Sequence, residues 1–184
     1  ANLRSGAMLQ PCRGFGAGRD LQVWREGNLG FLRLGSMQVV GDVNDTYRAL
    51  DAAMAALVGC DALIVDLLDN HGGDWVVMGY AASAFLPAGS NLVPHRGERR
   101  IRTDGRLMST VEILDARLRR APVPELRPSR LVVLVDQWTA SAAEILAAVL
   151  RCKAGAQLIG ERTTGAETWV HEESGPDGSR ILFG

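Results

Sequence analysis

Residues 131–146, which read LVVLVDQWTASAAEIL, constrain the fold more than any other stretch of the chain. The first five residues are apolar and mostly β-branched, which is typical of a strand buried on both faces. After a tight turn, apolar residues recur at helical spacing. These positions are Ile145, Leu146, Val149 and Leu150. We therefore expect a buried strand that turns sharply into a helix, with Ser141 at the junction.

Two roles are open for Ser141 at this junction. Together with Glu144 it fits a capping box, in which each side chain accepts a backbone N–H at the start of the helix. The N–H groups of a first helical turn have no partner within the helix, and the helix dipole favours negative charge there. A developing oxyanion could be bound at such a place. The local pattern alone favours capping, so a catalytic role needs support from elsewhere in the chain.

Further segments extend the alternation of strands and helices. The pattern predicts a hairpin of strands 21–24 and 29–34, a helix over 42–58, a strand over 62–67, a helix over 75–85 and a strand over 157–159. This order predicts an α/β fold with a mainly parallel sheet, right-handed crossovers and a small N-terminal hairpin. The loops after residues 66 and 135 then lie at one edge of the sheet, where the sites of α/β proteins gather.

The segment 94–130 differs in composition from the rest of the chain. It holds ten arginines and five acidic residues, a charge of +5, which leaves −6 for the remainder of a chain with net charge −1. A solvated face explains this charge more simply than an anion site. We expect a short strand near 99–103, a helix near 111–119 and a proline-rich connector. Beyond residue 165 we expect a strand over 168–172, a turn at 176–178 and a return strand from 181, which the chain's end truncates.

Composition restricts the chemistry. A net charge of −1 gives no reason to expect nucleic acid or an anionic membrane as partner, and no apolar run reaches the roughly 20 residues of a membrane span. The three cysteines form no CxxC pair, and neither a metal site nor a cofactor is predicted. Candidate general bases are few: one lysine, Lys153, and three histidines, His71, His95 and His171.

Four blocks of sequence resemble, in order and spacing, the C-terminal processing (tail-specific) serine peptidases. They are DLLDNHGG at 66–73, LVVLVD at 131–136, TASAAE at 139–144 and GERTTG at 160–165. The resemblance covers residues 28–184 and leaves 1–27 as an N-terminal arm and first strand. It implies a ClpP/crotonase-like peptidase core, closer to the tricorn core and the repeats of a retinoid-binding protein. With 27 residues before the match, no PDZ module is expected within this chain.

The resemblance also implies roles for particular residues. Ser141 would be the nucleophile, and the N–H of Ala142 would form the oxyanion hole with a glycine of the Gly72-Gly73 pair. The lysine base of the processing branch falls at Ala166 and is absent. Lys153 follows Ser141 by 12 residues on the same expected helix, or about 18 Å at 1.5 Å per residue. Proton transfer needs a separation of about 3 Å, so Lys153 is no substitute.

Histidine offers another base, because the tricorn-like branch takes one from its N-terminal part. No histidine precedes His71 in this chain. His71 adjoins the expected oxyanion loop, and His171 lies on a strand that could return toward Ser141. Neither occupies a motif position of the family, and both also suit a polar surface. His95, in a Pro-His-Arg loop, is expected to have no catalytic role.

The function implied is a serine-type peptidase that acts on peptide or protein C-termini through an acyl-enzyme on Ser141, with its general base unassigned. The missing lysine favours an alternative, a catalytically inactive homologue that binds peptide or a small apolar ligand. A crotonase-type acyl-CoA enzyme is a third option, because it would share the architecture. The resemblance favours a periplasmic or secreted location over a cytoplasmic one, and the oligomeric state, a homo-oligomer included, stays open.

Overall fold

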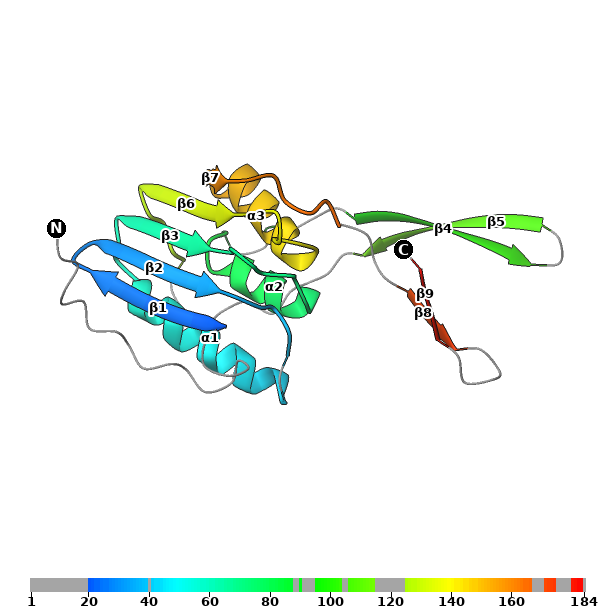
Figure 1. The fold of residues 1–184 in the computed structure, drawn as a ribbon, viewed down its shortest axis with the longest axis horizontal. Coiled ribbons are helices and arrows are strands. Elements are labelled where there is room, and N and C mark those ends of the chain that lie inside the picture. Colours follow the sequence, from blue (N-terminus) through cyan, green and yellow to red (C-terminus); the bar gives the residue numbers. More distant parts are fainter. Residues whose placement is uncertain are drawn as a thin grey trace.

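The computed structural model describes residues 20–39, 41–87, 90, 95–103, 106–114, 125–166, 171–174 and 180–183. Its main feature is a five-stranded sheet with the order β1-β2-β3-β6-β7. These strands are β1 (Leu21–Glu26), β2 (Leu29–Leu34), β3 (Ala62–Asp66), β6 (Arg130–Val135) and β7 (Gln157–Gly160). The strands β1 and β2 form an antiparallel hairpin, and the other pairs are parallel (Figure 1). The predicted α/β fold with a mainly parallel sheet and an N-terminal hairpin is confirmed.

Three helices connect the parallel strands. They are α1 (Val43–Leu57), α2 (Trp75–Ser83) and α3 (Ala142–Lys153). Each crossover places its second strand beside its first, so the sheet grows in one direction and the connecting helices gather on one face. None of the helices in the described part of the chain is long and apolar enough to cross a membrane.

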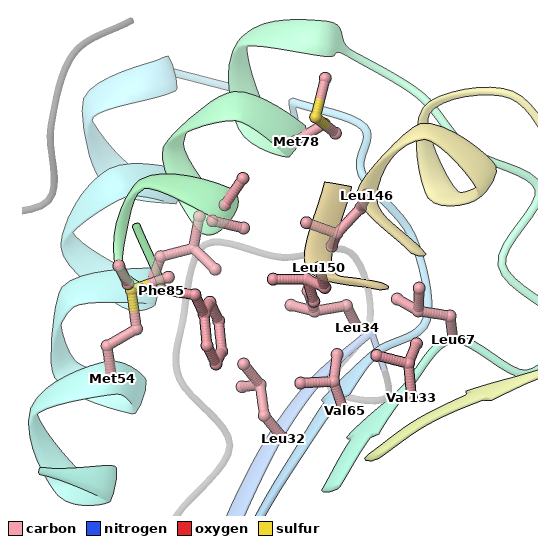
Figure 2. Close-up of a cluster of buried hydrophobic side chains, with 14 of the residues drawn as sticks. Leu32, Leu34, Met54, Val65, Leu67, Met78, Phe85, Val133, Leu146 and Leu150 are labelled. Carbon is pink, nitrogen blue, oxygen red and sulfur yellow. The ribbon is translucent and has the colours of Figure 1, made fainter. Parts of the chain in front are cut away.

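The core lies between this face of the sheet and the three helices (Figure 2). The strands contribute every second residue, and α1 and α3 contribute one apolar stripe each, while α2 is buried all round over residues 77–82. Members of the core include Leu32, Leu34, Val65, Val133, Met54, Met78, Leu146 and Leu150. The expectation that residues 131–135 are buried on both faces is wrong, because Val132 and Leu134 on the opposite face are only half-buried. One helical layer covers one face of a sheet.

Local sequence explains where α1 begins and ends. The Asp42 carboxylate accepts the N–H of Asn44 at 2.9 Å, which caps the helix. Gly59, with φ of 79°, follows its C-terminal end. Val58, the last residue of the helix expected over 42–58, lies past the last helical residue and is 38% exposed. The helix therefore ends one residue earlier than predicted.

The arginine-rich segment forms a β-hairpin of β4 (His95–Thr103) and β5 (Arg106–Leu114). The predicted helix near 111–119 is wrong over 111–114, where each residue pairs with β4, for example Val111 with Glu98. Residues 107–114 read LMSTVEIL, and their β-branched residues favour a strand once a partner strand is available. Residues 115–119, and Pro122 and Pro124 of the predicted connector, lie outside the described residues.

A second hairpin, β8 (His171–Ser174) with β9 (Arg180–Phe183), overlaps the two strands predicted at the C-terminal end. Residues 167–170, 175–179 and 184 lie outside the described residues, as do residues 1–19 of the predicted arm. The division into an arm of residues 1–27 and a core of residues 28–184 stays a prediction. The truncation of the core at its C-terminal end stays one as well.

Candidate active site

Ser141 sits in a strained turn between β6 and α3, residues 136–141, which we call the serine turn. Its backbone has φ of 52° and ψ of −123°. Non-glycine residues rarely adopt a positive φ. The other two helix N-caps, Asp42 and Asp74, have ordinary extended backbones with φ of −83° and −71°. Ser141 therefore differs from a normal N-cap, although it directly precedes a helix.

Asp136 and Thr139 hold the serine turn in shape. Asp136 Oδ1 accepts the N–H groups of Trp138 at 3.0 Å and Thr139 at 2.9 Å. The Thr139 hydroxyl donates to the carbonyl of Leu67 at 2.9 Å, and Asp136 Oδ2 accepts the N–H of Asp69 at 3.0 Å. These bonds tie the serine turn to the loop that follows β3, residues 69–74, which we call the glycine loop.

The glycine loop lies against Ser141 so closely that a side chain would not fit. A Cβ atom added to Gly72 would lie 2.8 Å from Ser141 Cβ and 3.0 Å from the Ala142 nitrogen. Gly72 also has φ of 89°, and Gly73 has φ of 140° with backbone atoms of Met37 in the place of a side chain. The predicted juxtaposition of the Gly72-Gly73 pair with Ser141 and Ala142 is therefore present in the structure.

Two backbone N–H groups in this region have no hydrogen-bond acceptor within the described residues. The Ala142 N–H, at the first position of α3, and the Gly73 N–H donate to no other residue in the described ranges. The Gly72 N–H is occupied, because it donates to Asn70 Oδ1 at 2.8 Å. The Ser141 N–H is occupied too, by Glu144 Oε2 at 2.9 Å. Between the glycines, the free amide belongs to Gly73.

Asn70 fixes the glycine loop from within the core. It is fully buried. Its Nδ2 donates to the Leu34 carbonyl at 2.6 Å, while its own carbonyl accepts the Ala140 N–H at 2.9 Å. The Asn70 side chain thus joins the end of β2 to the glycine loop, and its backbone carbonyl joins that loop to the serine turn.

Glu144 connects the serine turn to residues 161–166, which we call the threonine loop. Its carboxylate accepts the N–H of Gly165 at 2.7 Å and of Ala166 at 2.9 Å, besides that of Ser141. Burial by itself would raise the pKa of Glu144. Hydrogen bonds from the Thr163 side chain and from these backbone amides outweigh it and hold the pKa below its usual value. Glu144 is therefore an anion at neutral pH.

Both contacts of a capping box are present between Ser141 and Glu144, but only one of them is a hydrogen bond of normal geometry. Glu144 accepts the Ser141 N–H, as the motif requires. The Ser141 hydroxyl faces the backbone N–H of Glu144, as in a capping box, but it makes no cap hydrogen bond of normal geometry. The hydroxyl therefore has only a loose contact with its own helix.

The candidate bases lie at different places relative to Ser141. His71 Nε2 lies 3.3 Å from Asp69 Oδ1, and its side chain is 68% exposed. The ring centroids of His71 and Trp138 are 6.2 Å apart, which places His71 beside the serine turn. His171 belongs to β8, but its side chain lies outside the described part of the chain, as does that of His95 in β4. Lys153 is the last residue of α3, at the end opposite Ser141.

Three residues of this site make hydrogen bonds that the sequence did not indicate. Asn70 and Asp136 were part of recognisable blocks, and only the structure shows the contacts that their side chains make. Glu144 was expected to cap α3, and nothing in the sequence indicated its bonds to the threonine loop. The signal that could have found Asn70 and Asp136 is their type, because Asn and Asp side chains in turns often accept hydrogen bonds from nearby backbone N–H groups. No group of three potential ligands is placed to hold a metal ion within the described residues.

A mainly parallel sheet with one helical layer, and a serine at a strained strand-to-helix turn, define an α/β fold of the ClpP/crotonase type. The chain belongs to peptidase family S41, whose model matches residues 28–183. The carboxy-terminal processing protease CtpA of Bacillus subtilis (strain 168) is 32% identical over 150 residues, which is 80% of this chain and 29% of that protein. The chain thus spans less than a third of this curated relative.

Solved structures agree with this fold. The photosystem II D1 C-terminal processing protease matches with a TM-score of 0.53 and 28% identity, over 84% of this chain and 36% of its own. Mature CPAF complexed with lactacystin matches with a TM-score of 0.63 and 16% identity, over 93% of this chain and 45% of its own. The predicted family of C-terminal processing serine peptidases is confirmed. The closer placement beside the tricorn core and the retinoid-binding repeats stays a prediction.

Proposed function

We propose that the chain is the core of a serine peptidase that forms an acyl-enzyme on Ser141. The backbone of Ser141 carries this proposal, because its φ of 52° is not that of a simple N-cap. Strained non-glycine residues persist where their surroundings hold them, and they cluster at functional sites. The nucleophile of other hydrolases also sits on a sharp, strained strand-to-helix turn, with the N–H of the following residue in the oxyanion hole.

The free amides supply the second half of the chemistry. The Ser141 oxygen attacks the scissile carbonyl while a base takes its proton, and the carbonyl oxygen becomes an oxyanion. The N–H groups of Ala142 and Gly73 would stabilise that charge. Collapse of the intermediate breaks the C–N bond, the leaving amine takes the proton from the base, and water then hydrolyses the ester. Gly72 would contribute through its lack of a side chain rather than through its N–H.

For the base we propose His71, with His171 as the second candidate. The 3.3 Å contact between His71 Nε2 and Asp69 Oδ1 would orient the imidazole and leave its other nitrogen for the Ser141 proton. The exposure of His71 would fall when a substrate covers it. His171 would require a contact made by a side chain outside the described part, and for that reason it ranks second.

The substrates that we propose are peptide or protein C-termini, after the processing proteases to which the chain is similar. An extended peptide would bind by adding a strand to a sheet edge. A location outside the cytoplasm and a homo-oligomeric assembly are further predictions that accompany this assignment.

A fluorophosphonate probe with intact-mass detection tests the nucleophile. We expect one adduct on the wild-type chain and none on Ser141→Ala. His71→Gln should slow labelling at neutral pH by about 100-fold, a typical general-base contribution. Equal labelling of wild type and Ser141→Ala would refute the nucleophile, and equal rates for wild type and His71→Gln would exclude His71 as the base.

The alternative function is an inactive homologue that binds peptide or a small apolar ligand. Position 166 favours it, because the resemblance places the lysine base there and the residue is alanine. The Ala166 N–H bonds the same Glu144 oxygen as the Ser141 N–H, so a side chain at 166 starts close to the serine. Peptide binding without labelling of the wild-type chain, together with labelling of Ala166→Lys, would establish an intact serine site that has lost its base.

A further inference from the structure

Glu144 makes more contacts than the cap of a helix requires. It is the third residue of α3 and only 3% exposed. A capping box accounts for one bond, the one from the Ser141 N–H. The bonds from Gly165 and Ala166 come from a loop that is 21 and 22 residues further along the chain. These two amides belong to exposed residues, yet their N–H groups point at a buried carboxylate.

A single oxygen of Glu144 joins the serine turn to the threonine loop. Oε2 accepts both the Ser141 N–H and the Ala166 N–H, each at 2.9 Å. Thr164 adds two bonds between the same segments, from its N–H to the Thr139 carbonyl at 3.0 Å and from its hydroxyl to the Gln137 carbonyl at 2.8 Å. The Thr164 bonds involve other residues of the turn, so the carboxylate is the link that reaches Ser141 itself.

The same contacts rule out a role for Glu144 as the general base. A general base needs a free lone pair and a pKa near the working pH. The carboxylate already accepts three backbone N–H groups, and the pKa of Glu144 lies below its usual value because hydrogen bonds from Thr163 and the backbone outweigh the effect of burial. Glu144 therefore stays ionised and fully bonded, which suits a group that positions others.

We propose that Glu144 is a positioning residue that sets the Ser141 backbone and holds residues 165–166 against it. This inference rests on the proposed function. Glu144 accepts the Ser141 N–H, which leaves the next amide along the chain, the Ala142 N–H, to face an oxyanion. By taking the two amides of the threonine loop, it fixes the distance between the nucleophile and whatever side chain stands at position 166.

Two substitutions separate the geometry from the charge. Glu144→Gln keeps the length of the side chain but replaces one oxygen with an NH₂ group, which would face a backbone N–H. Glu144→Asp keeps both oxygens and the charge, but it is one methylene shorter and cannot reach both segments. Glu161→Gln is the matched control, because Glu161 is an exposed glutamate of the same loop.

The measurement is the rate of fluorophosphonate labelling at increasing probe concentration, which separates the limiting rate constant from the half-saturating concentration. For Glu144→Gln we expect the limiting rate to fall about 100-fold, the cost of a displacement of about 1 Å, with little change in half-saturation. For Glu144→Asp we expect a partial rescue, a loss of about tenfold. Glu161→Gln should label like the wild type. The loss should be constant from pH 5 to 9, about the range where a carboxylate stays ionised.

The labelled fraction distinguishes this role from a fault in folding. If a smaller fraction of Glu144→Gln molecules reacts with the probe, but those molecules react at the wild-type rate, then Glu144 only supports the fold. That result would overturn the positioning role. A wild-type rate in a folded Glu144→Gln also overturns it. If the wild type does not label, the proposed function fails and the catalytic part of this inference fails with it. Amide hydrogen exchange then still tests the structural part: the amides of 165 and 166 should lose protection in Glu144→Gln, and unchanged protection would refute it.

Discussion

Asn70 determines, at the scale of one residue, whether the glycine loop faces the serine turn. Its side-chain NH₂ group donates to the Leu34 carbonyl, and its side-chain oxygen accepts the Gly72 N–H. The residue has no access to solvent. A buried amide with both ends bonded costs little in the native state, while one that loses a partner costs about 1–3 kcal/mol. The loop therefore has one favourable arrangement. That arrangement is the one in which Gly72 contacts Ser141.

Gly72→Ala should damage the site more than its backbone alone explains. A Cβ at residue 72 would lie 2.7 Å from the Ala140 carbonyl oxygen and 2.8 Å from Ser141 Cβ. Gly59→Ala is the control, because Gly59 has a similar φ of 79° and nothing within 4 Å of an added Cβ. We expect Gly59→Ala to cost about 1–2 kcal/mol of unfolding free energy.

For Gly72→Ala we expect the same backbone cost and about 1–3 kcal/mol more from overpacking, together with loss of fluorophosphonate labelling. Urea denaturation followed by circular dichroism measures both costs. Equal destabilisation by the two substitutions, with labelling retained in Gly72→Ala, would show that the contact between the glycine loop and Ser141 is not close in solution.

At the scale of elements, the threonine loop is attached to α3 through an ionised carboxylate. The folded pKa of Glu144 lies below its unfolded value, because hydrogen bonds from Thr163 and the backbone outweigh burial. A group with a depressed pKa stabilises the folded state above its unfolded pKa, and that contribution disappears as the pH falls through the folded pKa. Protonation of Glu144 would therefore weaken the attachment of the threonine loop to α3.

Stability should accordingly depend on pH through this residue. As the pH falls from the unfolded pKa of Glu144, which is about 4.5, toward the lower folded pKa, the wild type should lose the contribution of Glu144. Glu144→Gln should be less stable at pH 7 and should show a shallower decline below pH 4.5. Thermal unfolding from pH 3 to 7 measures both, with Glu161→Gln as control. Parallel profiles for wild type and Glu144→Gln would contradict the depressed pKa.

The elements that could be predicted from sequence are those with local signals. The strands at 29–34, 62–66 and 131–135 were predicted to within a residue, because their apolar runs end in polar or glycine-rich turns. Residues 111–114 were assigned to a helix because they pair with residues 95–98, the part of β4 that precedes the strand expected near 99–103. The same limit applies to the site. The motifs indicated Ser141 and the Gly72-Gly73 pair, but the bonds from Glu144 to residues 165–166 depend on segments that only folding brings together.

At the scale of the whole molecule, the site is supported by a single core. Residues from all three helices and from the sheet belong to one buried cluster. The glycine loop, the serine turn and the threonine loop all leave the carboxyl edge of the parallel strands above this cluster. A domain with one core unfolds cooperatively as a rule, so the fold and the site should be lost together.

Leu150→Ala tests this coupling. Leu150 is fully buried in α3, far along the helix from Ser141. We expect its truncation to cost about 3 kcal/mol and to lower the urea midpoint without changing the labelling rate of the folded molecules. Ile159→Ala, at a site 46% exposed, is the control and should cost little. A labelling rate that falls in Leu150→Ala under native conditions would mean that the core and the site are coupled in the folded state as well.

The position of Lys153 has a practical consequence for anyone who immobilises or labels this protein. Lys153 is the one lysine of the sequence, and it lies at the C-terminal end of α3, opposite Ser141 at the N-terminal end. Amine-directed reagents would attach a surface, a dye or a biotin either here or at the α-amino group, which has the lower pKa and is favoured near neutral pH. Molecules attached through Lys153 would present their serine outward for binding measurements on a sensor chip.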